Sequence, residues 1–99
     1  MEARIREELF NLGILSNRKG YVYIVDIMSN LDSALAIGDA VKKVAEKYSK
    51  SKDSIGSAVR NAIKTANHNL EAWKNYDCLT IKGFITTMYY RCKEENANE

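Results

Sequence analysis

The sequence predicts an all-α, compact domain of five to six helices. Its 99 residues include no proline, the residue that most strongly interrupts a helix. Apolar residues recur at spacings of three and four along most of the chain, and the alternation typical of half-buried strands is almost absent. Chains of this length usually form one core, so residues 1–99 are expected to fold as a single domain.

The first half of the chain predicts two helices and a short helical turn. Residues 2–12 form an amphipathic helix that Gly13 ends in the left-handed conformation. A second helix follows a turn at 16–20, with Asp26 on its outer face, and 30–38 form the helical turn. The side chains of the first and second helices that are expected to point inward are Ile5, Leu9, Leu12, Tyr21, Ile24, Val25, Met28 and Leu31.

Residues 39–67 have the sharpest pattern, which indicates two helices joined by a short turn. The first begins at Asp39, and the turn at 49–51 interrupts its apolar period. Ser51 is a suitable N-cap for the second helix, 52–67, because its hydroxyl can accept a first-turn N–H. The apolar faces consist of Val41, Val44, Ala45, Tyr48, Ile55, Ala58, Val59, Ala62, Ile63 and Ala66.

The C-terminal third predicts a connection followed by a closing helix. Residues 67–77 are rich in turn formers, and Leu70, Trp73 and Tyr76 are expected to fill the base of the core. The last helix starts near Thr80 as its N-cap and leaves 94–99 as a polar, frayed tail. Its apolar side consists of Ile81, Phe84, Ile85, Met88, Tyr89 and Cys92.

The spacing within 39–67 fits a helix-turn-helix. Such a motif needs a small residue where its two helices meet, and Ala45 occupies that place. Ile55 and Ala58 follow at the distances expected for contacts from the second helix. Ser49 stands where glycine is common in the turn. The alternative is an ordinary αα-hairpin, which has the same spacing.

Charge and side-chain chemistry favour DNA as the partner. Residues 42–64 carry seven basic and two acidic residues, a net +5, whereas the rest carries eight basic and eleven acidic, a net −3. Lysines on a solvated helix face would produce a similar cluster. Arginine can fork onto guanine and asparagine can pair with adenine in the major groove. The predicted base contacts are Arg60, Asn61 and Ser57. The predicted phosphate contacts are Lys50, Lys52 and Lys64.

Several segments resemble a known family. Residues 19–24 (KGYVYI), 44–48 (VAEKY), 55–66 (IGSAVRNAIKTA) and 84–85 are similar to the C-terminal DNA-binding effector domain of the stage 0 sporulation response regulators. The resemblance implies a cytoplasmic transcription regulator of roughly six helices. It also implies that the domain reads a short promoter element in double-stranded DNA, as a homodimer or as two copies in tandem.

The chain departs from that family in the second helix of the motif. Gly56 and Ser57 stand where the family usually has a Glu-Arg pair, and Asn61 stands where it tends to have histidine. Arg60 alone carries over as a matching base contact. The family's phosphorylatable receiver domain is also absent, which fits either a piece of a longer regulator or a free-standing relative. We therefore expect a related fold with a different promoter target.

Other function classes find little support in the sequence. No phosphate-binding, nucleophile-elbow or zinc-protease motif occurs, so neither an enzyme nor a cofactor is expected. Cys78, Cys92 and His68 lack the spacing of a metal site. No apolar run is long enough to span a bilayer, so neither a membrane nor a secretory signal is expected.

A protein-interaction module on a degenerate copy of the same fold is the main rival hypothesis. It is prompted by Gly56, which costs about 1 kcal/mol relative to alanine inside a helix. In that case Tyr89 and Tyr90 of the closing helix would form a dimer or partner surface.

Overall fold

The computed structural model describes residues 2–76 and 80–97, and every regular element within them is helical. The elements are α1 (Glu2–Asn11), α2 (Lys19–Ser29), η1 (Ala34–Ala36), α3 (Ile37–Lys47), α4 (Lys52–Thr65), η2 (Glu71–Asn75) and α5 (Ile81–Ala97), where η denotes a 3₁₀ helix. The predicted all-α fold of five helices is confirmed. In the described part of the chain, no helix is both long and apolar enough to cross a membrane.

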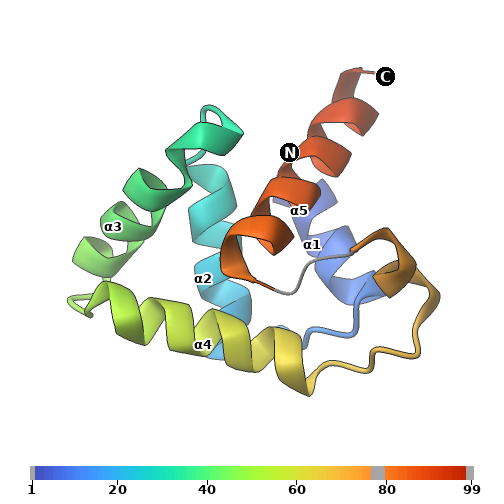
Figure 1. Ribbon diagram of the computed structural model, residues 1–99, viewed down its shortest axis with the longest axis horizontal. Coiled ribbons are helices and arrows are strands. Elements are labelled where there is room, and N and C mark those ends of the chain that lie inside the picture. The colour runs from blue at the N-terminus through green and yellow to red at the C-terminus, as the bar shows by residue number, and fades with distance from the viewer. Residues whose placement is uncertain (1, 77–79, 98–99) are drawn as a thin grey trace.

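Helix α2 lies at the centre of the fold and contacts the other four α-helices (Figure 1). Helix α4 runs along one side of the molecule, beside the end of α3, and α1 and α5 lie on the side of α2 away from α3. Most of the predicted core is confirmed, because Ile5, Leu9, Leu12, Ile24, Met28, Val44, Ile55, Val59, Phe84, Ile85 and Met88 are all buried. Other predicted core residues are only half-buried and pack against this core: Val41, Tyr48, Ala58, Ala66 and Ile81.

Helix α1 ends as the sequence predicts, at a glycine in the left-handed conformation. Gly13 has a φ of 74°. The Gly13 N–H donates to the Phe10 carbonyl and the Ile14 N–H to the Leu9 carbonyl, each at 3.0 Å. These two bonds form a Schellman motif, in which Ile14 packs into the core beyond the helix end.

Four predicted boundaries are wrong by a few residues. Helix α2 begins at Lys19, before the predicted turn ends, and α3 begins at Ile37, because Ile37 and Ala40 are buried and extend its apolar face. Helix α4 ends at Thr65, two residues early. Helix α5 continues to Ala97, so 94–97 are helical rather than frayed.

The connection after α4 fills the base of the core through two of its three predicted residues. Trp73 and Tyr76 are buried, whereas Leu70 is half-buried. The Trp73 indole N–H donates to the Leu12 carbonyl at 2.9 Å, which ties η2 to the end of α1. Asp77 and Cys78 lie outside the described residues.

A buried carboxylate joins the two ends of the chain. Glu8 of α1 is 3% exposed. It accepts bonds from the Arg91 Nε at 2.7 Å and the Tyr76 hydroxyl at 2.8 Å, and pairs with Arg4 at 2.9 Å. Burial by itself would raise the pKa of Glu8, but the hydrogen bonds from Arg91 and Tyr76 outweigh it and lower the pKa.

Candidate nucleic-acid interface

Helices α3 and α4 are joined by a tight turn at 48–51 that repeats the motif found after α1. The Lys50 N–H donates to the Ala45 carbonyl at 2.9 Å, and the Ser49 N–H donates to the Glu46 carbonyl at 3.2 Å. Ser49 has a φ of 55°, where glycine is the favoured residue. The turn therefore keeps the backbone of a Schellman motif at the cost of placing a side chain in the left-handed region.

The predicted cap of α4 is confirmed. The Ser51 hydroxyl accepts the Ser54 N–H at 3.0 Å, so one unpaired donor of the first turn is satisfied. Because the turn before it and the cap are both bonded, the start of α4 is fixed relative to α3.

The C-terminal end of α3 is anchored on α2 through Asp26. Tyr48 donates its hydroxyl to Asp26 Oδ2, and the Lys47 Nζ lies 3.2 Å from the same oxygen. The hydrogen bond to Asp26 raises the pKa of both Lys47 and Tyr48. Asp26, which the sequence places on an outer face of its helix, is thus half-buried there and bonded to the end of α3.

Helices α2 and α4 approach each other closely at Gly20. A Cβ added to Gly20 would stand 2.5 Å from the Ala58 carbonyl oxygen and 2.5 Å from the Ala62 Cβ. Small residues at 20, 58 and 62 thus let the two backbones touch. The sequence contained this signal, as alanines four apart on α4, but the predicted small residue, Ala45, concerned the contact between α3 and α4 and left the one between α2 and α4 unpredicted.

The exposed face of α4 contains Ser57, Arg60, Asn61 and Lys64, and Asp53 and Ser54 are exposed in the first turn of the same helix. The Arg60 guanidinium donates to the Ser57 hydroxyl at 3.4 Å, so two of the predicted base contacts lie together. A Cβ added to Gly56 would stand 3.5 Å from an Arg60 guanidinium nitrogen and 3.2 Å from the Ile81 Cδ1. An added Cβ would thus make an ordinary contact with Arg60 and a tight one with Ile81, so Gly56 lies where α4 packs closely against α5.

Two cavities flank this face, and they separate the predicted contacts. Asn61 lies in a cavity of about 300 Å³, which is lined by Asn17, Arg18, Lys19, Gly20, Ala58, Asn61 and Ala62. Arg60 and Lys64 line a groove of about 440 Å³ on the other flank, together with Ile63 and His68. Arg60 and Asn61 are thus brought to opposite edges of one helix face, with Ser57 and Lys64 between them.

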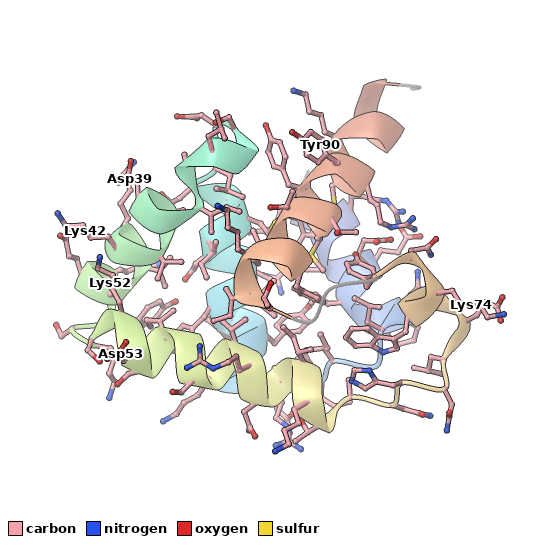
Figure 2. The ribbon with its side chains drawn as sticks, viewed as in Figure 1. Asp39, Lys42, Lys52, Asp53, Lys74 and Tyr90 are labelled. Carbon is pink, nitrogen blue, oxygen red and sulfur yellow. The ribbon has the colours of Figure 1, made fainter. Side chains whose placement is uncertain are left out.

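The predicted phosphate contacts lie at both ends of α4. Lys50 and Lys52 are exposed at its start, and Lys64 is exposed in its last turn. In Figure 2, Lys52 and Asp53 lie at the start of α4 near the end of α3, whereas Lys74 projects from the opposite side of the molecule. The basic residues of α4 are therefore separated along its length rather than gathered at one point.

His68 is a residue of this region that the predictions did not include. Its Nε2 lies 2.7 Å from the Ile63 carbonyl oxygen, at the end of α4. Its ring stacks on Trp73, with 4.2 Å between the centroids and 12° between the planes. Nothing in the sequence pattern indicated this, because the contact depends on the path of residues 66–70 between α4 and η2.

The tyrosine surface proposed for the rival hypothesis is only half present. Tyr89 is buried, and its hydroxyl donates to the Asp32 carbonyl at 2.9 Å. Tyr90 is half-exposed and lies on the part of α5 far from α4 (Figure 2). The hydrogen bond to Asp32 directs Tyr89 toward η1, so Tyr89 is not available for the partner surface that the rival hypothesis assigned to it.

The chemistry of the exposed face of α4 suits a nucleic acid. A guanidinium and an amide can each form paired hydrogen bonds with base edges, and ammonium groups at both ends can meet phosphates. No family model, curated protein or solved structure matches the chain. What α4 can bind is therefore inferred from its own residues.

Proposed function

We propose that the chain is a sequence-specific, double-stranded DNA-binding domain of a transcription regulator, with α4 as the recognition helix. The exposed face of α4 is the observation that carries the proposal. It presents a guanidinium, an amide and a hydroxyl between lysines, on a helix whose opposite face is buried. This is the arrangement that a helix-turn-helix offers to the major groove.

The length of α4 supports its proposed place in the major groove. Its 14 residues span about 21 Å, and the major groove is about 12 Å wide. A helix of that length can place Lys50 and Lys52 near one strand and Lys64 near the other while its middle faces the bases. Arg60, Asn61 and Ser57 are then the base contacts of the proposal.

The resemblance to the sporulation effector domains is part of the same proposal. It favours a cytoplasmic regulator that binds as a homodimer or in tandem along the DNA. Gly56 and Ser57 replace the family's Glu-Arg pair, and Gly56 packs beside Ile81 of α5. The reading of bases is thereby shifted toward Arg60 and Asn61, so the proposal includes a promoter target unlike the family's usual one.

The first test separates DNA binding from other functions of a basic helix. Fluorescence anisotropy with random-sequence duplex DNA, at two salt concentrations, should show binding that weakens steeply with salt. Lys52→Ala should lower the affinity for every duplex and reduce the salt slope by about 0.9. Lys74→Ala is the matched control: it removes the same charge from an exposed residue far from α4, and its affinity should equal that of the wild type.

The second test addresses sequence specificity. Binding-site selection from a random library should yield a preferred site, and Arg60→Ala should lose about 1–3 kcal/mol at one base pair of that site. Intact preference in Arg60→Ala would remove Arg60 from the interface. If even random duplex fails to bind at low salt, the DNA proposal is refuted and the protein-interaction hypothesis takes its place.

A further inference from the structure

Two large apolar side chains are exposed on one surface, at the junction of α1 and α2. Phe10 of α1 is 81% exposed, and Leu15 in the connection to α2 is 57% exposed. The left-handed turn at Gly13 lies between them, and both side chains line the same cavity. Single exposed apolar residues are ordinary, but a contiguous apolar surface marks a place of interaction. We call Phe10, Leu15 and the cavity that they line the Phe10 patch.

The cavity of the Phe10 patch has a volume of about 350 Å³. Its described lining contains no charged residue and consists of Phe10, Gly13, Ile14, Leu15, Ser16 and Tyr21. Ile14 and Tyr21 are buried and belong to the core, so the cavity has a fixed wall. An apolar cavity of about 150 Å³ is enough to hold a benzene ring. The Phe10 patch therefore has room for an aromatic side chain from another molecule.

The Phe10 patch is complementary in shape to a second copy of itself. It presents an exposed phenylalanine ring next to a cavity that can admit one. In a contact with twofold symmetry, the same surface of two copies meets, so every projection must find its counterpart on that surface. Phe10 of each copy would then enter the cavity of the other and contact its Leu15.

The charges beside the Phe10 patch also fit a second copy. Glu2 and Arg6 line a cavity that adjoins the patch through Tyr21, and the two side chains pair at 3.8 Å. Arg18 lines a cavity that adjoins the patch through residues 13–15 instead. Twofold symmetry exchanges the two sides of a surface, so Arg18 of one copy can face Glu2 of the other. A strongly acidic or strongly basic partner would meet a charge of its own sign on one side.

The area of the Phe10 patch determines how tightly two copies can bind. From the usual surface of an aromatic and of a leucine side chain, Phe10 and Leu15 together expose roughly 250 Å². A stable interface buries about 800 Å² of each partner. The contact is therefore weak in dilute solution. Two copies on one DNA molecule meet at an effective concentration in the millimolar range, at which a contact of this size can form.

The Phe10 patch lies beside the C-terminal part of α4. Leu15 lines a small cavity together with Ala62, Thr65 and Ala66 of that helix. The connection between α1 and α2 passes the same end of α4 (Figure 1). A second copy on the patch would thus be placed next to the proposed recognition helix.

We propose that the Phe10 patch joins two copies of this chain in a twofold contact, with each Phe10 ring in the cavity of the other copy. The inference deepens the proposed function and rests on it for its consequence, which is cooperative binding to two DNA half-sites. The contact itself forms between the free proteins and is tested without DNA.

The first test measures self-association by sedimentation equilibrium. The wild type should be monomeric at about 10 µM and largely dimeric at about 1 mM, as expected for a small interface. Phe10→Ser should remain monomeric at both concentrations, and so should Leu15→Ser, which changes the connection rather than a helix. Both side chains are exposed, so the core is unaffected and the circular dichroism spectra should match that of the wild type.

Leu35→Ser is the matched control. Leu35 is 96% exposed in η1, which packs against α3 and α5, and it does not line the cavity of the Phe10 patch. This variant should dimerise like the wild type. A wild type that stays monomeric at about 1 mM would overturn the inference, and so would variants of Phe10 and Leu15 that dimerise like the control.

The second test separates the inference from the proposed function. A duplex carries two inverted copies of the selected site, about one helical turn apart. The wild type should occupy the second copy at least about tenfold more tightly than the first. Phe10→Ser should occupy both with the wild-type affinity for a single site. Independent binding of the wild type to the two copies would contradict the inference. Dimerisation of a protein that binds no duplex would refute the proposed function and leave the contact established.

Discussion

Gly20→Ala tests the close approach of α2 and α4 on which the position of the exposed face of α4 depends. The added methyl group would lie 2.5 Å from both the Ala58 carbonyl oxygen and the Ala62 Cβ, where ordinary contacts begin near 3.4 Å. One neighbour is backbone and the other is a side-chain atom attached directly to it, so neither can rotate away. The two helices must separate by about 1 Å or deform.

The expected cost is large for a single methyl group. Overpacking of a well-packed interface costs about 1–3 kcal/mol, and the separation also loosens the contacts of Ile55 and Val59 beneath α4. The better helix propensity of alanine offsets part of this cost in stability. We expect a net loss of about 2 kcal/mol in the free energy of unfolding, which lowers the melting temperature by roughly 10 °C for a domain of this size.

The assay is urea unfolding followed by far-UV circular dichroism, with Gly38→Ala as the matched control. Gly38 lies in the first turn of α3, and nothing stands within 4 Å of an added Cβ there. The control should be neutral or more stable by up to about 1 kcal/mol. If Gly20→Ala proves as stable as Gly38→Ala, the helices do not touch at Gly20 and the placement of α4 is wrong.

Two further predictions concern the turn before α4 and the buried carboxylate. Ser49→Gly should raise the free energy of unfolding by about 1 kcal/mol, because Ser49 has a φ of 55°; urea unfolding that shows a loss would contradict the left-handed turn. Glu8→Gln should cost about 3 kcal/mol at neutral pH, because it removes the carboxylate charge between Arg4 and Arg91. Since folding lowers the pKa of Glu8, its contribution is present above the unfolded-state value near 4.3 and is lost as pH falls through the folded value. Unfolding curves of both proteins should therefore converge in acid, and a cost that is constant with pH would contradict the network.

Periodicity in the sequence was sufficient to predict the helices and the core, because burial of an apolar face is a local and repetitive signal. The ends of the elements were predicted where a single residue determines them. Gly13, Ser51 and Thr80 each act on backbone groups within three residues, and the Gly83 N–H indeed reaches the Thr80 hydroxyl at 3.1 Å. Capping was therefore predictable from the residue types alone.

The predictions failed where a residue's surroundings come from distant parts of the chain. Asp26 is polar and was assigned to an outer face, but its bond to Tyr48 of α3 was not predicted. The role of Gly20 depends on which face of α4 crosses it, and that of His68 on the path of the connection after α4. In each case the partner lies five or more residues away and is selected by tertiary packing, which one sequence does not specify.

The buried network around Glu8 also constrains the order in which the chain can fold. Its bonds join residue 8 to residues 76 and 91, so they span most of the sequence. During synthesis α1 leaves the ribosome first, yet its carboxylate cannot reach its final partners until α5 has followed. Helices α2, α3 and α4, whose mutual contacts are closer in sequence, can associate earlier. The part of the molecule that contains the exposed face of α4 can thus assemble first, and docking of α1 onto α5 follows.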